Sequence, residues 1–185
     1  MRTGILAALL AVLGVSLCLN VSLGWKLRTR SARPRAGIEV GMRLAALPIL
    51  RESGARDELK FDSKRSTIAY VFSPACGWCK RNLPNIRALA AQTAQRYSLI
   101  GLSSTTTNLQ GYQESANLDF PAYALDLPRL PKGFNASVTP QTALVRSDGL
   151  VMKVWEGAYT GKDKKEIEAG FHVKLPGIAG MPKQR

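Results

Sequence analysis

Cys76 and Cys79 are the two residues whose type and spacing point most directly to chemistry, in the stretch CGWC. Two cysteines at this spacing can close into a disulfide and exchange it with other thiols. The first thiolate attacks, and the second releases the product from the mixed disulfide. Half of a zinc site has the same spacing, but the chain has no second such pair and one histidine, His172. We therefore predict redox chemistry here and no metal site.

The cysteine pair follows a predicted buried strand and opens a predicted helix. Residues 67–73 (TIAYVFS) are a short apolar run that Pro74 ends, and residues 83–97 carry apolar side chains at helical spacing. A cysteine at a helix N-terminus faces free backbone N–H groups and the positive end of the helix dipole, which favour its thiolate. We therefore predict that Cys76 is the exposed nucleophile and Cys79, one turn further on, is the shielded resolving thiol.

The rest of the pattern predicts an α/β layer fold, because strands and helices alternate along the chain. Further strands are expected at 44–50, 58–61, 98–103, 122–125, 141–146 and 150–156, and further helices at 108–117 and 162–171. The turn sequence SDG at 147–149 predicts a hairpin between the last two strands. Phe72 and Trp155 lie within strands and are expected in the core.

These features resemble the thioredoxin-like superfamily, and more narrowly its membrane-tethered bacterial branch of TlpA and ResA type. The resemblance covers about residues 44–171 and rests on VFSPACGWCKRNLPNI at 71–86 and VTPQT at 138–142. It implies a thioredoxin-like fold, with a central mixed sheet flanked by helices. It also implies a thiol–disulfide oxidoreductase that acts on protein thiols and disulfides, needs no dissociable cofactor and is recycled by a membrane electron-transfer partner.

The second motif matches the place where this family has a cis proline facing the cysteines, and Pro140 is the corresponding residue. A proline leaves one backbone edge unpaired, so the main chain of Thr139 can bind an extended substrate peptide. Trp78 is expected to flank the exposed sulfur and to contact partners through its apolar ring. The chain departs from the family at Tyr70, which stands where thioredoxins bury an acid. No acidic residue follows the pair either, since the sequence continues Lys80-Arg81-Asn82-Leu83.

The N-terminus predicts a membrane attachment. Residues 4–24 are uncharged and mostly apolar, and as a helix they would be about 31 Å long, enough to span a bilayer. A signal peptide cut after Gly24 is the alternative, because Ser22 and Gly24 are small. The resemblance implies a single-pass anchor in the inner membrane with the soluble domain in the periplasm. The cations that follow residue 24 favour the opposite topology by the positive-inside rule.

Charge and composition exclude several classes of protein. Hydrophobic residues make up 45% of the 185 residues, so most of the chain can fold around a core. Residues 1–35 hold six of the 26 basic residues and none of the 13 acidic ones, beside the apolar segment. No basic run alternates with aromatic residues, so we expect no nucleic-acid partner. The resulting layout is an anchor or signal at 1–25, a basic tether at 26–41, a thioredoxin-like domain at 42–175 and a tail at 176–185.

Two other functions on the same fold remain open. A copper-binding chaperone would hold a soft metal ion between the two thiolates, with His172 as the one available imidazole. A peroxidase would place a threonine three residues before its reactive cysteine, where this chain has Ser73. For the oxidoreductase, the resemblance implies clients such as apocytochrome c or other periplasmic proteins under maturation.

Overall fold

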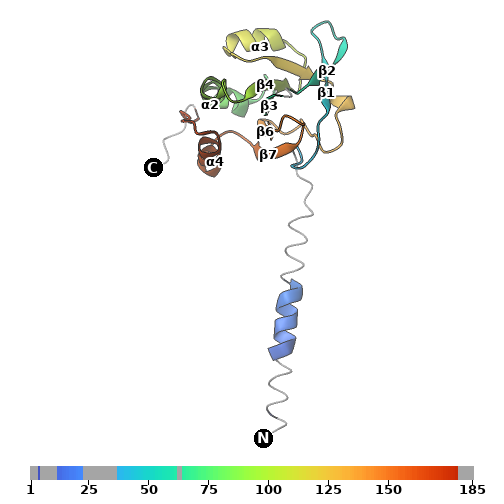
Figure 1. Cartoon of the computed structure of the whole chain (residues 1–185), viewed down its shortest axis with the longest axis vertical. Coiled ribbons are helices and arrows are strands. Elements are labelled where there is room, and N and C mark those ends of the chain that lie inside the picture. Colours follow the sequence, from blue (N-terminus) through green and yellow to red (C-terminus); the bar gives the residue numbers. More distant parts are fainter. Residues whose placement is uncertain (1–3, 5–11, 23–36, 62–63, 179–185) are drawn as a thin grey trace. The chain divides into compact units, whose positions relative to one another are not determined.

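The computed structural model describes residues 4, 12–22, 37–61 and 64–178. Contacts divide the chain into two compact units, Met1–Arg35 and Ala36–Arg185. Residues 12–22 of the first unit are helical (Figure 1). Among the described residues, no helix is both long enough and apolar enough to cross a membrane. Residues 5–11 and 23–24 of the predicted span lie outside the described residues.

The second unit is built on a seven-stranded mixed sheet in the order β2-β1-β5-β4-β3-β6-β7. The strands are β1 (Ala46–Leu50), β2 (Arg56–Lys60), β3 (Thr67–Phe72), β4 (Ser98–Ser103), β5 (Ala122–Leu125), β6 (Gln141–Val145) and β7 (Val151–Glu156). The run β3-β4-β5 is parallel, and the remaining neighbours pair antiparallel. All six residues of β3 are buried. The prediction of a buried strand before the cysteines is therefore confirmed.

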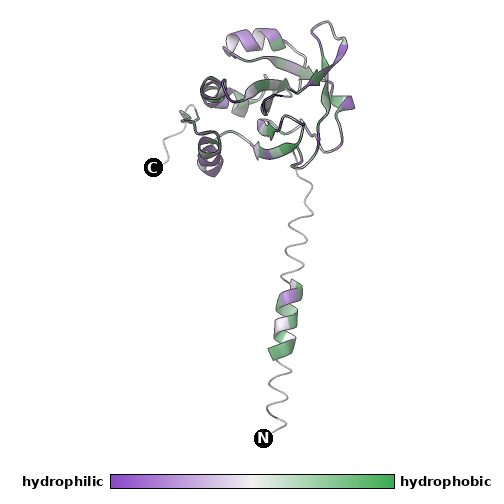
Figure 2. Cartoon of the chain, viewed as in Figure 1, coloured by the Kyte–Doolittle hydropathy of each residue, from purple (hydrophilic) through white to green (hydrophobic). Residues whose placement is uncertain are grey.

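The helices of this unit cover one face of the sheet. They are α2 (Gly77–Thr93), α3 (Leu109–Ser115) and α4 (Gly161–Phe171) (Figure 1). Alternate side chains of β3, those of Ile68, Tyr70 and Phe72, pack into one core cluster with buried residues of α2 and α4. Figure 2 shows apolar residues concentrated along the strands, while α3 and α4 are largely polar on the outside.

Extended chain covers the other face of the sheet. Ala69 and Val71 of β3 pack there against Ile38, Leu44 and Phe134, and no buried member of this second cluster belongs to a described helix. The prediction of a sheet flanked by helices is thus confirmed for one face only. The loop after β5 contributes a short 3-10 helix, η1 (Leu127–Arg129), that the sequence pattern did not indicate.

Residues 37–41, which the sequence assigned to the tether, pack onto the domain. Ile38 has no exposed surface. The N–H of Gly41 donates to the carbonyl of Val151 at 2.9 Å, and the N–H of Leu44 donates to that of Gly149 at 2.8 Å. Gly149 has φ +84°, and a Cβ there would lie 2.0 Å from the carbonyl oxygen of Leu44. Only glycine fits this close approach of the two chains.

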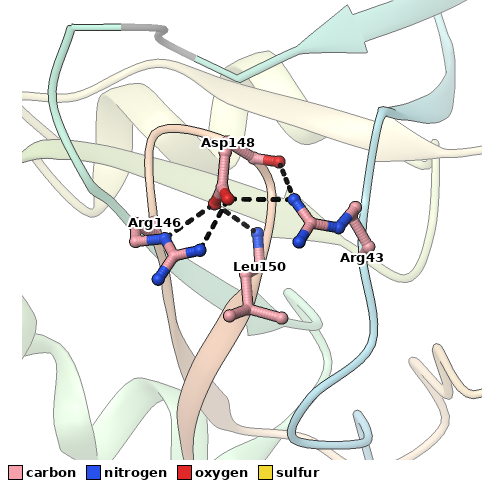
Figure 3. Close-up of polar contacts among 4 residues, drawn as sticks. All are labelled: Arg43, Arg146, Asp148 and Leu150. Carbon is pink, nitrogen blue, oxygen red and sulfur yellow. Dashed lines mark hydrogen bonds and ion pairs between the residues drawn. The ribbon is translucent and has the colours of Figure 1, made fainter.

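Just after this segment, Arg43 forms an ion pair with the turn between β6 and β7. Asp148 lies between Arg43 and Arg146, with carboxylate–guanidinium distances of 2.9 and 2.6 Å (Figure 3). A carboxylate oxygen of Asp148 also accepts from the N–H of Leu150. The hydrogen bonds from Arg146, together with those from Leu150 and Arg43, hold the pKa of Asp148 well below its usual range. Asp148 therefore stays ionised at neutral pH and fixes the predicted hairpin turn.

Candidate active site

Cys76 occupies the position that the helix-terminus argument predicts. It is the N-cap of α2, in an extended conformation, and its Sγ accepts the N–H of Cys79 at 3.1 Å. The N–H of Cys76 donates to the carbonyl of Ser73 at 3.0 Å, which forms the tight turn between β3 and α2. Helix α2 begins at Gly77, six residues earlier than its apolar periodicity indicates. The cysteine pair therefore lies in the cap and first turn of this helix.

Cys76 and Cys79 form a disulfide whose two sulfurs differ in exposure. Cys79 has no exposed surface and belongs to the core cluster, whereas Cys76 is half-buried. An incoming thiolate can therefore reach Cys76 and not Cys79. This difference fits the predicted roles of nucleophile and resolving thiol.

The second predicted motif lies against the exposed sulfur. The Thr139–Pro140 peptide bond is cis, as the resemblance implies. The carbonyl oxygen of Thr139 is 3.6 Å from the Sγ of Cys76. Neither backbone polar group of Thr139 has a backbone hydrogen bond within the part of the chain that the structure describes. Both groups are thus available for the predicted pairing with a substrate peptide.

Gln141 holds this motif in place, and the sequence alone did not single it out. Its side chain is fully buried. Its Oε1 accepts the N–H of Ile38 at 3.0 Å, and its Nε2 donates to the carbonyls of Asn135 at 2.6 Å and Val138 at 2.8 Å. One amide therefore ties the start of β6 to the loop before Thr139 and to the first segment of the domain.

Polar side chains that the sequence did not predict lie behind Cys79. Asn82 is fully buried on α2, and its Oδ1 accepts the N–H of Tyr159 at 3.1 Å. The hydroxyls of Tyr159 and Thr142 are 2.5 Å apart, and Thr142 pairs with Tyr70 across β6 and β3. Burial raises the pKa of both Tyr70 and Tyr159, so both phenols stay protonated. The Asn82-x-x-Asn85 spacing on the apolar face of the helix is the one sequence signal of this network.

Trp78 projects from the first turn of α2 and is 47% exposed. The guanidinium of Arg81 lies 5.3 Å from the centre of its ring. A large exposed aromatic side chain beside a reactive site is a common anchor for protein partners. The contact between Trp78 and client proteins stays a prediction.

A groove runs beside the cysteine pair between α2 and α3. Its lining includes Pro74, Lys80 and Leu83 on one side and Thr107 and Tyr112 on the other. The helix predicted at 108–117 is α3, which forms the far wall of this groove, and the strand predicted at 122–125 is β5 of the sheet.

His172 lies apart from the cysteines. It is exposed and caps the C-terminus of α4 with φ 52°. Its surroundings are Gln92, Glu168 and Lys174. Within the described residues, no group of three or more His, Cys, Asp or Glu side chains is arranged to hold a metal ion.

Comparison with known proteins agrees with this geometry. The chain matches no protein-family model and no curated protein. It is similar to a solved structure of a candidate thiol:disulfide interchange protein DsbE from Chlorobium tepidum, with 15% identity, a TM-score of 0.58, and coverage of 72% of this chain and 95% of that one. It is also similar to StoA from Bacillus subtilis, with 19% identity, a TM-score of 0.51, and coverage of 66% and 96%.

Peroxidoxin BcpB from Mycobacterium tuberculosis is similar as well, with 18% identity, a TM-score of 0.53, and coverage of 73% of this chain and 97% of that one. At such identities the likeness shows the fold alone, which is a mixed α/β, thioredoxin-like fold. On this fold the chain carries a Cys-x-x-Cys pair at the N-terminus of a helix.

Proposed function

We propose that this protein is a membrane-anchored thiol–disulfide oxidoreductase whose substrates are protein thiols and disulfides. The observation that carries the proposal is the paired sulfurs at the start of α2, one reachable and one fully buried. The peroxidoxin likeness reports the same fold and does not favour a peroxidase, since Ser73 stands three residues before Cys76.

The exchange needs only the two sulfurs of this chain. In the oxidising direction, a client thiolate attacks the Sγ of Cys76, a client–Cys76 disulfide forms, and the electron pair of the broken bond stays on Cys79. A second client thiolate then attacks the client sulfur and releases Cys76 as a thiolate. In the reducing direction, the Cys76 thiolate attacks a client disulfide, and Cys79 then attacks Cys76 and frees the client thiol. The free N-terminal N–H groups of α2 stabilise the Cys76 thiolate in both directions.

The substrate class follows from the surroundings of Cys76. The unpaired backbone of Thr139 suits an extended peptide, and the groove beside α3 gives a larger client further contact. The exposed ring of Trp78 adds an apolar contact. We propose proteins under maturation in the periplasm as clients, cytochrome c apoproteins among them, and a membrane electron-transfer partner as the source or sink of electrons.

For localisation, we propose an uncleaved inner-membrane anchor at residues 4–24 with the domain in the periplasm. The supporting observations are the apolar composition of that stretch and the helical residues 12–22 within it. The topology can be tested in spheroplasts that express the Cys79→Ser chain. They are labelled with a thiol reagent that does not cross membranes. Labelled Cys76 supports the proposal, and labelling only after lysis contradicts it.

Turnover of a protein disulfide by the full chain in detergent tests the activity. Reduction of insulin by dithiothreitol should accelerate with the wild-type chain and with Cys18→Ser, a matched control because Cys18 lies outside the pair. Cys76→Ser should abolish turnover. Cys79→Ser should instead accumulate a mixed disulfide with the substrate. A wild-type chain that binds one Cu(I) per molecule and catalyses no exchange would establish the copper-chaperone alternative.

A further inference from the structure

Two buried hydrogen-bond donors near the disulfide lack a full set of acceptors among the described residues. They are the hydroxyl of Tyr70 on β3, a residue 1% exposed, and the Nδ2 of Asn82 on α2, a residue with no exposed surface. Buried polar groups in folded proteins are nearly always hydrogen-bonded, so each unpaired one needs an explanation. Both donors lie on the face of the sheet where Cys79 is buried.

The orientation of the Asn82 amide is fixed by its oxygen. Oδ1 accepts the backbone N–H of Tyr159 at 3.1 Å and the Nδ2 of Asn85 at 2.9 Å. A backbone N–H cannot accept a hydrogen bond, so rotating the amide by 180° would place two donors against each other. The NH₂ group of Asn82 therefore has to find its acceptor elsewhere. Cys79 is three residues earlier on the same buried face of α2, one turn away.

The hydroxyl hydrogen of Tyr70 also lacks an acceptor among the described residues. Its cross-strand neighbour Thr142 already shares a hydrogen bond with Tyr159. Burial keeps Tyr70 protonated by raising its pKa, and a hydrogen bond from the Asn82 amide to the phenol oxygen opposes part of that rise. The O–H of Tyr70 and the second N–H of the Asn82 amide are therefore two neutral donors side by side. It occupies the strand that leads directly into the cysteine pair.

Among the described residues, the carboxylates near this cluster have other partners. The one that contacts it, Glu166 beside Trp155, is paired with Lys153. Asp126 is the buried carboxylate among the described residues. It follows β5, two strands away from β3, and pairs with Arg56 and Arg129. The Sγ of Cys79 is the candidate acceptor, because Cys79 lies on the same buried face of α2 as Asn82 and in the same core cluster as Tyr70.

We propose that Tyr70 and Asn82 form a donor site for the Cys79 thiolate, occupied only when the disulfide is open. This inference rests on the proposed function. When a client thiolate attacks Cys76, the electron pair of the broken S–S bond passes to the Sγ of Cys79, which then accepts hydrogen bonds from Tyr70 Oη–H and Asn82 Nδ2–H. No proton is transferred. Because a more stable thiolate is a better leaving group, the site accelerates this step and favours the reduced protein.

The pKa of Cys79 tests the proposal without reference to turnover. In the full chain carrying Cys18→Ser and Cys76→Ser, the carbon-13 shift of the Cys79 Cβ reports the thiol–thiolate equilibrium as pH changes. Tyr70→Phe removes one donor and little volume, so the Cys79 pKa should rise by about one unit, a tenfold loss of thiolate. Tyr123→Phe is the matched control, because Tyr123 packs on the opposite face of the sheet. An unchanged Cys79 pKa in Tyr70→Phe would overturn the proposal and assign the hydroxyl to a trapped water.

A second variant separates the amide from the phenol. Asn82→Asp keeps the oxygen that accepts from Tyr159 and replaces the donor with an acceptor, so the Cys79 pKa should rise at least as far as in Tyr70→Phe. With both cysteines restored, Tyr70→Phe should also slow opening of the disulfide by dithiothreitol several-fold, while Tyr123→Phe leaves the rate unchanged. Equal rates in the two variants would count against the donor site. The variants can also change the Cys79 pKa and the opening rate as expected while the wild-type chain turns over no protein disulfide. That result would leave the donor site in place and refute the proposed function alone.

Discussion

Gln141→Met is the substitution that best separates hydrogen bonding from packing near the site. The two side chains have similar volume, so the change removes polar atoms without opening a large cavity. The N–H of fully buried Ile38 loses its acceptor, which costs about 1–3 kcal/mol. The carbonyls of Asn135 and Val138 are only partly buried and each lose a bond worth about 0.5–1.5 kcal/mol. The expected loss in the free energy of unfolding is therefore about 2–6 kcal/mol.

Gln92→Met is the matched control for this experiment. The Gln92 side chain also makes three hydrogen bonds to the backbone, two with Lys174 and one with Ala88, but it is exposed, so water can replace them. Its loss should cost less than about 1 kcal/mol. Urea unfolding of the full chain in detergent, followed by tryptophan fluorescence, measures both variants. Equal midpoints for the two variants would refute the inference that Gln141 anchors the loop before Thr139.

Three further predictions concern the turn and the client surface. Gly149→Ala should cost about 2–4 kcal/mol of unfolding free energy in urea, because its Cβ would meet the carbonyl oxygen of Leu44 and φ is +84°. Arg146 lowers the pKa of Asp148 in the folded chain, so the carboxylate stabilises the fold above about pH 4 and this contribution is lost as pH falls. Urea midpoints of wild type and Asp148→Asn should therefore differ at pH 6 and converge toward pH 2.5; a constant gap would contradict this. Trp78→Ala should lower kcat/KM for insulin about 5- to 30-fold and leave reduction by dithiothreitol within about twofold; equal losses in both assays would exclude a client contact.

The sequence predicts the sheet well because its strands have strong local signals. Apart from Ala69, residues 67–72 are all β-branched or aromatic, and the SDG turn joins β6 to β7 as expected. The motif around Cys76 locates the helix start better than periodicity does, since the first turn of α2 carries exposed residues such as Trp78 and Lys80. The local sequence pattern therefore predicts those helices and strands whose conformation depends mainly on their own residues.

What the sequence does not reveal depends on partners far along the chain. Gln141 and Ile38 are 103 residues apart, and Tyr159 and Asn82 are 77 apart, so no window of sequence contains either contact. A lone glutamine or asparagine is ordinarily exposed, which hides its role as a buried connector. The coverage of the second face by residues 37–44 and by the loop before Thr139 has no periodic signal either. Tertiary hydrogen bonding, rather than propensity, shapes this half of the site.

The most direct test of the central claim is the redox equilibrium of the full chain carrying Cys18→Ser. The protein is equilibrated with glutathione buffers of graded potential, its free thiols are alkylated, and its mass is measured by intact-protein mass spectrometry. We predict that Cys76 and Cys79 change together between two free thiols and one internal disulfide, with a midpoint between about −270 and −120 mV. A chain that takes up glutathione on Cys76 and never forms the internal disulfide would contradict the proposed oxidoreductase.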